Sequence, residues 1–172
     1  MVAPPPDPAA VARLRDALSL SRPLCALLAV RGLTDPSEAK DFLRPLLPTL
    51  AEPGLLADAD AAAERIHAAI RDGETILVHG DYDVDGICGA ALLTRWIREL
   101  GGRAEAFVPH RIRDGYDFGP AGIRAAEERG AGLVVTVDCG IRAVEAVRAA
   151  TDAGIDVVVT DHHAPGETLP PA

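Results

Sequence analysis

The chain has 172 residues, of which 48% are apolar, 25% are charged and only 3% are aromatic. That length and apolar content indicate a globular protein with a sizeable core and exclude a disordered chain. The formal net charge of −9 argues against binding of a nucleic-acid backbone by this chain through bulk charge alone. No apolar run could span a bilayer and the N-terminus lacks a signal-peptide pattern, so we expect a cytoplasmic protein with no membrane partner.

The first part of the chain is predicted to be a small helical region. Asp35, Pro36 and Glu38 mark one helix start, because Asp can cap the first amides and proline suits the first helical position. A Pro- and Leu-rich linker follows over 44–56, which closes an expected N-terminal region of residues 1–56. Helical patterns cover residues 8–20, 21–30 and 36–43.

The remainder, residues 57–172, alternates short Val- and Ile-rich runs with helical patterns. This alternation predicts an α/β fold, a parallel doubly wound sheet with right-handed crossovers, and we expect it to be the first part of one domain. Four strands with no closing element would leave an exposed edge, so we expect the chain to be truncated. The expected strands cover 76–78, 104–108, 133–137 and 157–160, and the expected helices cover 58–73, 87–100, 120–129 and 141–151.

Acidic and imidazole side chains follow three of these strands. Because parallel strands end at the same edge of a sheet, the side chains should converge there. Carboxylates packed this closely repel one another unless cations lie among them. Carboxylates mixed with imidazoles suit Mn²⁺, Fe²⁺, Co²⁺ or Zn²⁺ and also admit Mg²⁺, and a carboxylate shared by two ions is typical of two-metal hydrolases. The residues are His79, Asp81, Asp83 and Asp85 after the first strand, Asp138 after the third, and Asp161, His162 and His163 after the fourth.

Other interpretations of the acidic motif fit less well. The segment 81–86 matches the first half of an EF-hand loop, but Leu92 stands where that loop needs Glu. Asp83 and Asp85 also resemble the nucleophile motif of haloacid-dehalogenase-type phosphatases, which need a downstream basic residue. No lysine follows Lys40, although an arginine could substitute. From the pattern alone, Arg111 in the loop after the second strand could clamp a phosphate or simply be solvated.

The motifs together resemble the DHH phosphoesterase superfamily and, within it, the RecJ-type family of single-stranded-DNA-specific 5′→3′ exonucleases. The resemblance extends from about residue 12 to 165. It rests on His79-x3-Asp83-x-Asp85, Asp138 and Asp161-His162-His163, on the segment Gly80–Gly86, and on Pro53-Gly54-Leu55-Leu56 and Val108-Pro109-His110-Arg111.

The resemblance implies a role for each matching residue. His79, Asp83 and Asp138 would hold one Mn²⁺ or Mg²⁺ ion. Asp85, Asp138 and His162 would hold a second, so Asp138 would bridge the two. His163 would contact the scissile phosphate and stabilise its developing charge, and Arg111 would contact DNA phosphate. Asp81 would support the loop.

The implied activity is metal-dependent hydrolysis of single-stranded DNA from its 5′ end, in DNA repair and recombination. The implied partners are single-stranded DNA, a single-stranded-DNA-binding protein and a helicase. A fourth-motif carboxylate, a DHH-associated domain and an OB-fold, which the family carries, are not found in these 172 residues. Two alternatives therefore stay open: a DHH phosphodiesterase acting on short oligonucleotides or cyclic dinucleotides, and an inactive truncated fragment.

Overall fold

The structure is a computed structural model that describes residues 5–172, apart from the side chain of Thr49. The chain divides into two compact units, Met1–Leu55 and Leu56–Ala172. The domain boundary expected after residue 56 stays a prediction. No helix among the described residues is both long and apolar enough to cross a membrane.

The first unit is helical, as predicted. Its helices α1 and α3 begin after Asp7 and Asp35, whose side chains accept hydrogen bonds from backbone amides of the first turn. The buried side chains of the three helices form a small core of their own: Val11, Leu14, Cys25, Leu28 and Ala39. The helices are α1 (Pro8–Leu18), α2 (Arg22–Val30) and α3 (Pro36–Leu43), and short 3₁₀ turns follow at Leu47–Thr49 and Pro53–Leu55 within the expected linker.

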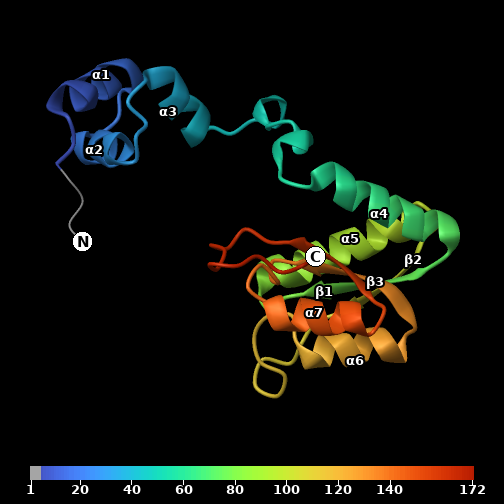
Figure 1. The fold of residues 1–172 in the computed structure, drawn as a ribbon. Coiled ribbons are helices and arrows are strands. Elements are labelled where there is room, and N and C mark those ends of the chain that lie inside the picture. The colour runs from blue at the N-terminus through green and yellow to red at the C-terminus, as the bar shows by residue number, and fades with distance from the viewer. Residues whose placement is uncertain (1–4) are drawn as a thin grey trace. The chain divides into compact units, whose positions relative to one another are not determined.

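The second unit is a four-stranded sheet with helices on both faces (Figure 1). All three strand pairs are parallel and the strand order is β2-β1-β3-β4. The predicted parallel doubly wound sheet, preceded by a small helical region, is therefore confirmed. The elements are α4 (Ala59–Asp72), β1 (Thr75–Gly80), α5 (Val84–Glu99), β2 (Arg103–Phe107), α6 (Pro120–Glu128), β3 (Ala131–Val137), α7 (Val144–Asp152) and β4 (Asp156–Thr160).

Side chains alternate between the two faces of the sheet, and each face has its own core. Ile76 and Val78 of β1 pack with α4 and α5, in a cluster that includes Ile66 and Ile97. Leu77 faces the opposite way and packs among apolar residues of α6 and α7. Both faces of β1 are therefore covered, which is why the sequence of this central strand is a continuous apolar run.

The acidic loop after β1 is tighter than the sequence predicted. Helix α5 begins at Val84, three residues before the predicted start, with Asp83 as its N-cap. Gly86 in the first turn of α5 lies directly against the backbone of Asp81, where an added Cβ would come within 2.6 Å of the Asp81 Cα. This close approach requires glycine at position 86.

We expect Gly86→Ala to destabilise the second unit by about 1–3 kcal/mol, because the new methyl group would displace backbone rather than a flexible side chain. In an open helix the same change would instead be stabilising. Urea unfolding followed by circular dichroism would measure the effect. Gly119→Ala is the matched control, since Gly119 has φ −158° and open space around its Cβ position. Equal stability of the two variants would contradict the close approach.

Candidate metal centre

The candidate site lies where the order of the strands reverses direction. From β1 the chain moves outward to β2 and then crosses back to β3 on the other side of β1. In open α/β sheets, ligands bind at the carboxyl ends of the strands at such a switch point. Asp81 and Asp83 follow β1, and Asp138 follows β3. The Asp81 amide donates to the Val137 carbonyl at 3.2 Å and so joins the two strand ends.

Within the described residues, two groups of side chains could each hold a metal ion. In each group, the candidate ligand atoms lie within 4.8 Å of one another. Asp138 belongs to both groups, and its predicted role as a shared ligand stays a prediction. The groups are Asp81, Asp83 and Asp138, and Asp138, His162 and His163.

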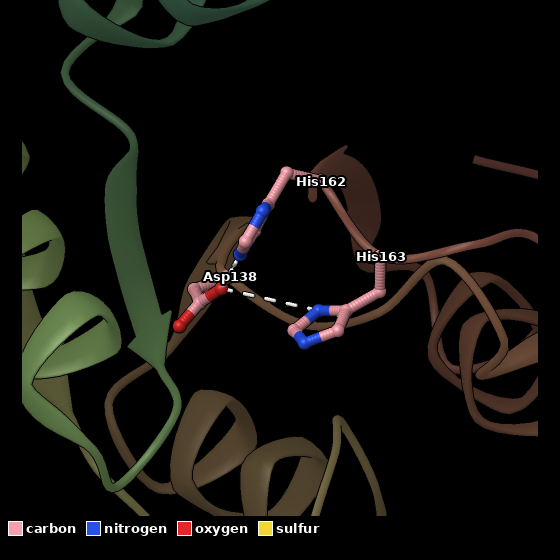
Figure 2. A group of neighbouring side chains, drawn as sticks. All are labelled: Asp138, His162 and His163. Carbon is pink, nitrogen blue, oxygen red and sulfur yellow. Dashed lines mark ion pairs between the residues drawn. The ribbon is translucent and has the colours of Figure 1, made fainter. Parts of the chain in front are cut away.

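Asp138 is held in a strained position. Its φ of 63° lies in the left-handed region, which a residue with a side chain seldom adopts. Its side chain is only 7% exposed. The carboxylate oxygen Oδ1 lies 2.8 Å from Nε2 of His162 and 3.9 Å from Nδ1 of His163, and Figure 2 shows both rings directed at this carboxylate. None of these approaches has hydrogen-bond geometry, so Oδ1 has no hydrogen-bond partner.

His163 is fixed by Asp161. The Asp161 Oδ1 atom lies 2.8 Å from His163 Nδ1 and also accepts the His163 backbone amide at 3.0 Å. The hydrogen bond to Asp161 raises the pKa of His163 above its ordinary value. Burial alone would raise the pKa of Asp161, but the amides of His163 and Ile141 donate to it and the pKa is lowered. The pair therefore favours a cationic imidazole beside an ionised carboxylate.

The two acids of the β1 loop have opposite environments. Asp83 is exposed, and the amides of Gly86 and Asp85 donate to its Oδ1, which lowers its pKa. Asp81 is only 3% exposed. Burial raises the pKa of Asp81, and the charges of Asp83 and Asp138 raise it further. This carboxylate is consequently the one that a bound cation would stabilise most in its ionised form.

The donor set fits divalent cations. Asp81 Oδ1 and Asp138 Oδ1 are buried carboxylate oxygens without a hydrogen-bond partner. Such atoms are costly in a folded protein unless something else satisfies them. A cation among three carboxylates and two imidazoles would do so, and oxygen and imidazole ligands suit Mn²⁺ and admit Mg²⁺.

His79 lies behind this centre rather than within it. Its side chain is buried on the α6/α7 face of the sheet, with its ring centroid 5.4 Å from that of Phe107 and 5.3 Å from that of Phe118. Nδ1 lies 3.6 Å from the Cys139 sulfur, and a Cβ added at Gly122 would come within 2.9 Å of Nε2. The alternation of strand side chains explains this placement. This arrangement does not support the predicted ligand role of His79, which stays a prediction.

Asp85 is also outside both groups. It is exposed in the first turn of α5, where its amide donates to Asp83. Its predicted ligand role is untested and stays a prediction. The family resemblance implies loop support for Asp81, whereas in the structure it lies with Asp83 and Asp138 in a group that could hold a metal ion. Asp81 could have been recognised by its spacing, since it is the first acid after the strand and lies next to the strand end.

A series of ring contacts leads from Arg111 in the β2–α6 loop to His163 at the candidate metal centre. The Arg111 guanidinium lies over the Tyr82 ring, 5.0 Å from its centroid. Tyr82 and Tyr116 meet edge to face with centroids 6.0 Å apart, and Tyr116 meets His163 at 6.3 Å. Burial raises the pKa of Tyr116 to about 12, so its phenol stays neutral. The structure thus brings Arg111 to the same edge of the sheet as the candidate ligands.

We expect Asp138→Asn to weaken Mn²⁺ binding by more than about 100-fold, because it would remove the predicted shared ligand, whereas losing a residue that only orients a ligand costs about 10–100-fold. Asparagine tolerates the left-handed backbone, so the fold should survive. Isothermal titration with Mn²⁺ would measure the change. Asp152→Ala, at the exposed end of α7, is the control. Unchanged stoichiometry and affinity in Asp138→Asn would rule out the shared ligand.

We expect His79 to make the fold sensitive to acid. Burial lowers its pKa to about 4 in the folded chain, against 6.5 when unfolded. Between these values the unfolded chain binds more protons, so stability falls as pH falls through this window. With EDTA present, the unmodified chain should lose about 2 kcal/mol more than His79→Leu between pH 7 and pH 5 in urea unfolding. Replacing the exposed His67 should leave this difference unchanged, and identical pH dependence in His79→Leu would contradict the prediction.

Comparisons with known proteins agree with this geometry. The DHH family, N-terminal domain, matches residues 75–172. The chain is 34% identical over 165 residues to the single-stranded-DNA-specific exonuclease RecJ of Bacillus subtilis (strain 168), covering 96% of this chain and 21% of that protein. It is 40% identical over 147 residues to RecJ of Escherichia coli (strain K12), covering 85% of this chain and 25% of that protein.

The solved structure of RecJ from Thermus thermophilus in complex with Mn²⁺ is also similar. The TM-score is 0.64 at 33% identity, over 96% of this chain and 23% of that one. The chain thus spans about a fifth to a quarter of the length of the curated relatives it matches. The family match covers more than half of the chain, including all four strands and both candidate ligand groups. The resemblance inferred from the motifs is confirmed, and the chain belongs to the DHH family.

Proposed function

We propose that the chain is the metal-binding part of a nuclease that hydrolyses single-stranded DNA from its 5′ end, in DNA repair and recombination. The observation that carries the proposal is the shared carboxylate of Asp138, which joins two ligand groups at the switch point of the sheet. Shared carboxylates of this kind serve two-metal hydrolysis of phosphate esters. The relatives that resemble this chain are single-stranded-DNA-specific exonucleases.

The proposed cofactor is a pair of Mn²⁺ or Mg²⁺ ions, the metals present in similar RecJ structures from Thermus thermophilus. Asp81, Asp83 and Asp138 would hold one ion, and Asp138 with His162 would hold the other. When bound, such ions lower the pKa of a water molecule and neutralise charge on a phosphate. The predicted ligands His79 and Asp85 would require a different local arrangement from the one described above.

His163 has the features of a group that stabilises negative charge. Asp161 fixes its ring and favours its cationic form, while 47% of its side chain stays exposed. A cationic imidazole beside Asp138 can donate a proton in a hydrogen bond to a phosphate oxygen. Because Asp161 orients the ring before substrate arrives, little reorganisation is needed as charge develops on that oxygen.

Arg111 is the proposed contact for DNA phosphate. It is exposed and lies over Tyr82, and ring contacts through Tyr82 and Tyr116 connect it with His163. An arginine placed over a ring can still present two N–H groups to a phosphate. The formal charge of −9 opposes the approach of DNA, so specific contacts such as this one must supply the affinity. A single-stranded-DNA-binding protein and a helicase stay predicted partners.

A nuclease assay tests the proposal. The 172-residue chain is incubated with single-stranded DNA labelled at either the 5′ or the 3′ end, with Mn²⁺ at low salt. Early release of the 5′ label, dependent on metal and abolished by Asp138→Asn, would support the proposed function. Hydrolysis confined to dinucleotides or cyclic dinucleotides would favour the alternative phosphodiesterase. Metal binding without hydrolysis of any of these substrates would indicate a non-catalytic fragment.

We expect His163→Ala to reduce the rate of DNA hydrolysis by about 10²–10³-fold, the usual cost of losing an oriented group that stabilises transition-state charge. Mn²⁺ affinity should fall less than in His162→Ala, because Nε2 of His162 lies nearer to Asp138 than Nδ1 of His163 does. Single-turnover kinetics and metal titration would separate the two effects. His67→Ala should behave as the unmodified chain does. Equal metal loss in the two histidine variants would contradict the division of roles.

A further inference from the structure

The turn that carries Asp138 is held by side chains from other parts of the second unit. Thr136 Oγ1 donates to the Cys139 carbonyl at 2.8 Å. The Ile141 amide donates to Asp161 Oδ2 at 3.0 Å. The Gly140 amide donates to Asp117 Oδ1 at 2.6 Å, the shortest of the three. Without these bonds, the Cys139 carbonyl and the Gly140 and Ile141 amides would lack hydrogen-bond partners near the buried end of β3.

The backbone of this turn would not hold its shape without such bonds. Asp138 has φ 63° and Gly140 has φ 105°, both in the left-handed region. Gly140 also has no room for a side chain, since a Cβ there would lie 2.7 Å from Thr136 Oγ1. A residue with a side chain, such as Asp138, keeps a left-handed conformation only where its surroundings impose it.

Asp117 is itself built into a fixed position. It lies in the β2–α6 loop with φ 76°, so like Asp138 it is a left-handed residue that carries a side chain. Its Oδ1 accepts the Phe118 amide at 2.8 Å as well as the Gly140 amide, and Phe118 is buried in the core under α6. Asp117 belongs to neither ligand group. Its carboxylate therefore connects the core of the unit with the turn that carries the shared ligand.

We propose that Asp117 is a positioning residue for the metal centre: through the Gly140 amide, it holds the turn in which Asp138 presents its carboxylate to both ligand groups. The inference rests on the proposed function of Asp138 as a shared metal ligand. Asp117 acts through the backbone and belongs to neither candidate ligand group. Residues that orient metal ligands without binding the ion commonly contribute about 10–100-fold to metal affinity.

Two substitutions at this position separate the hydrogen bond from the backbone conformation. Glycine adopts φ 76° freely but offers no acceptor, so Asp117→Gly removes the bonds to the Gly140 and Phe118 amides without straining the backbone. Asparagine tolerates the left-handed region and keeps an Oδ1 acceptor, so Asp117→Asn should retain the turn. Asp114→Ala is the matched control, because Asp114 also accepts a loop amide, that of His110, but does not touch the Asp138 turn.

The experiment is calorimetric titration of Mn²⁺ into the unmodified chain and the three variants. We expect Asp117→Gly to weaken Mn²⁺ binding by about 10–100-fold, Asp117→Asn to lose clearly less, and Asp114→Ala to match the unmodified chain. Circular dichroism would show whether each variant is folded. A folded Asp117→Gly with unchanged Mn²⁺ affinity would overturn the proposal, as would equal losses in the glycine and asparagine variants.

A second measurement needs neither metal nor the glycine variant. In nuclear magnetic resonance spectra of the metal-free chain, the Gly140 amide proton should be protected from exchange. Its signal should also move upfield in Asp117→Asn, because a charge-assisted bond becomes a neutral one. An unprotected Gly140 amide, or an unmoved signal, would overturn the proposal even if Asp117→Gly failed to fold. Failure of the unmodified chain to bind Mn²⁺ would instead refute the proposed metal centre. The amide data would still decide whether Asp117 holds the Gly140 amide.

Discussion

The mutual repulsion of three carboxylates at one edge of a parallel sheet is the constraint on which the rest of this structure depends. Asp81, Asp83 and Asp138 converge because β1 and β3 are neighbours that end at the same level. Two of them, Asp81 and Asp138, are buried, where charge is costly. The protein offsets only part of that cost, since an oxygen of each buried acid has no hydrogen-bond partner. The fold thereby holds in place an arrangement that divalent cations would stabilise.

Backbone amides hold most of this arrangement together. Asp83 and Asp161 each accept two amides, which keeps their pKa values low and their side chains fixed. Asp117 accepts the amide that follows the strained turn at Asp138. Because these amides belong to loops and to the first turn of α5, the geometry of the site depends on hydrogen bonds between the loops as well as on the sheet. Asp117 and Asp161, which lie outside the candidate ligand groups, thus accept backbone amides close to the candidate ligands.

The adjacent histidines show how one strand end can supply two different groups. Both imidazoles approach the carboxylate of Asp138 (Figure 2). Only the ring of His163 is also bonded to Asp161. Nε2 of His162 lies 2.8 Å from the Asp138 carboxylate, whereas the bond to Asp161 raises the pKa of His163 and biases that ring toward its charged form. The chain leaves β4 after Thr160, and beyond the strand the alternation of faces no longer applies.

Local rules of the sequence were sufficient to predict the helices and strands and their order along the chain. Short apolar runs predicted every strand, capping residues such as Asp35 predicted helix starts, and the acids after the strands predicted a metal-binding edge. Only the tertiary structure decided the left-handed backbone of Asp138, the bond from the Gly140 amide to Asp117, the placement of Asp81 beside Asp83 and Asp138, and the burial of His79 behind the site. Each depends on contacts between segments far apart in the chain, such as the bond between Asp117 and Gly140. Spacing along a sequence determines which residues reach an edge of a sheet, but only packing across that edge determines where each side chain points.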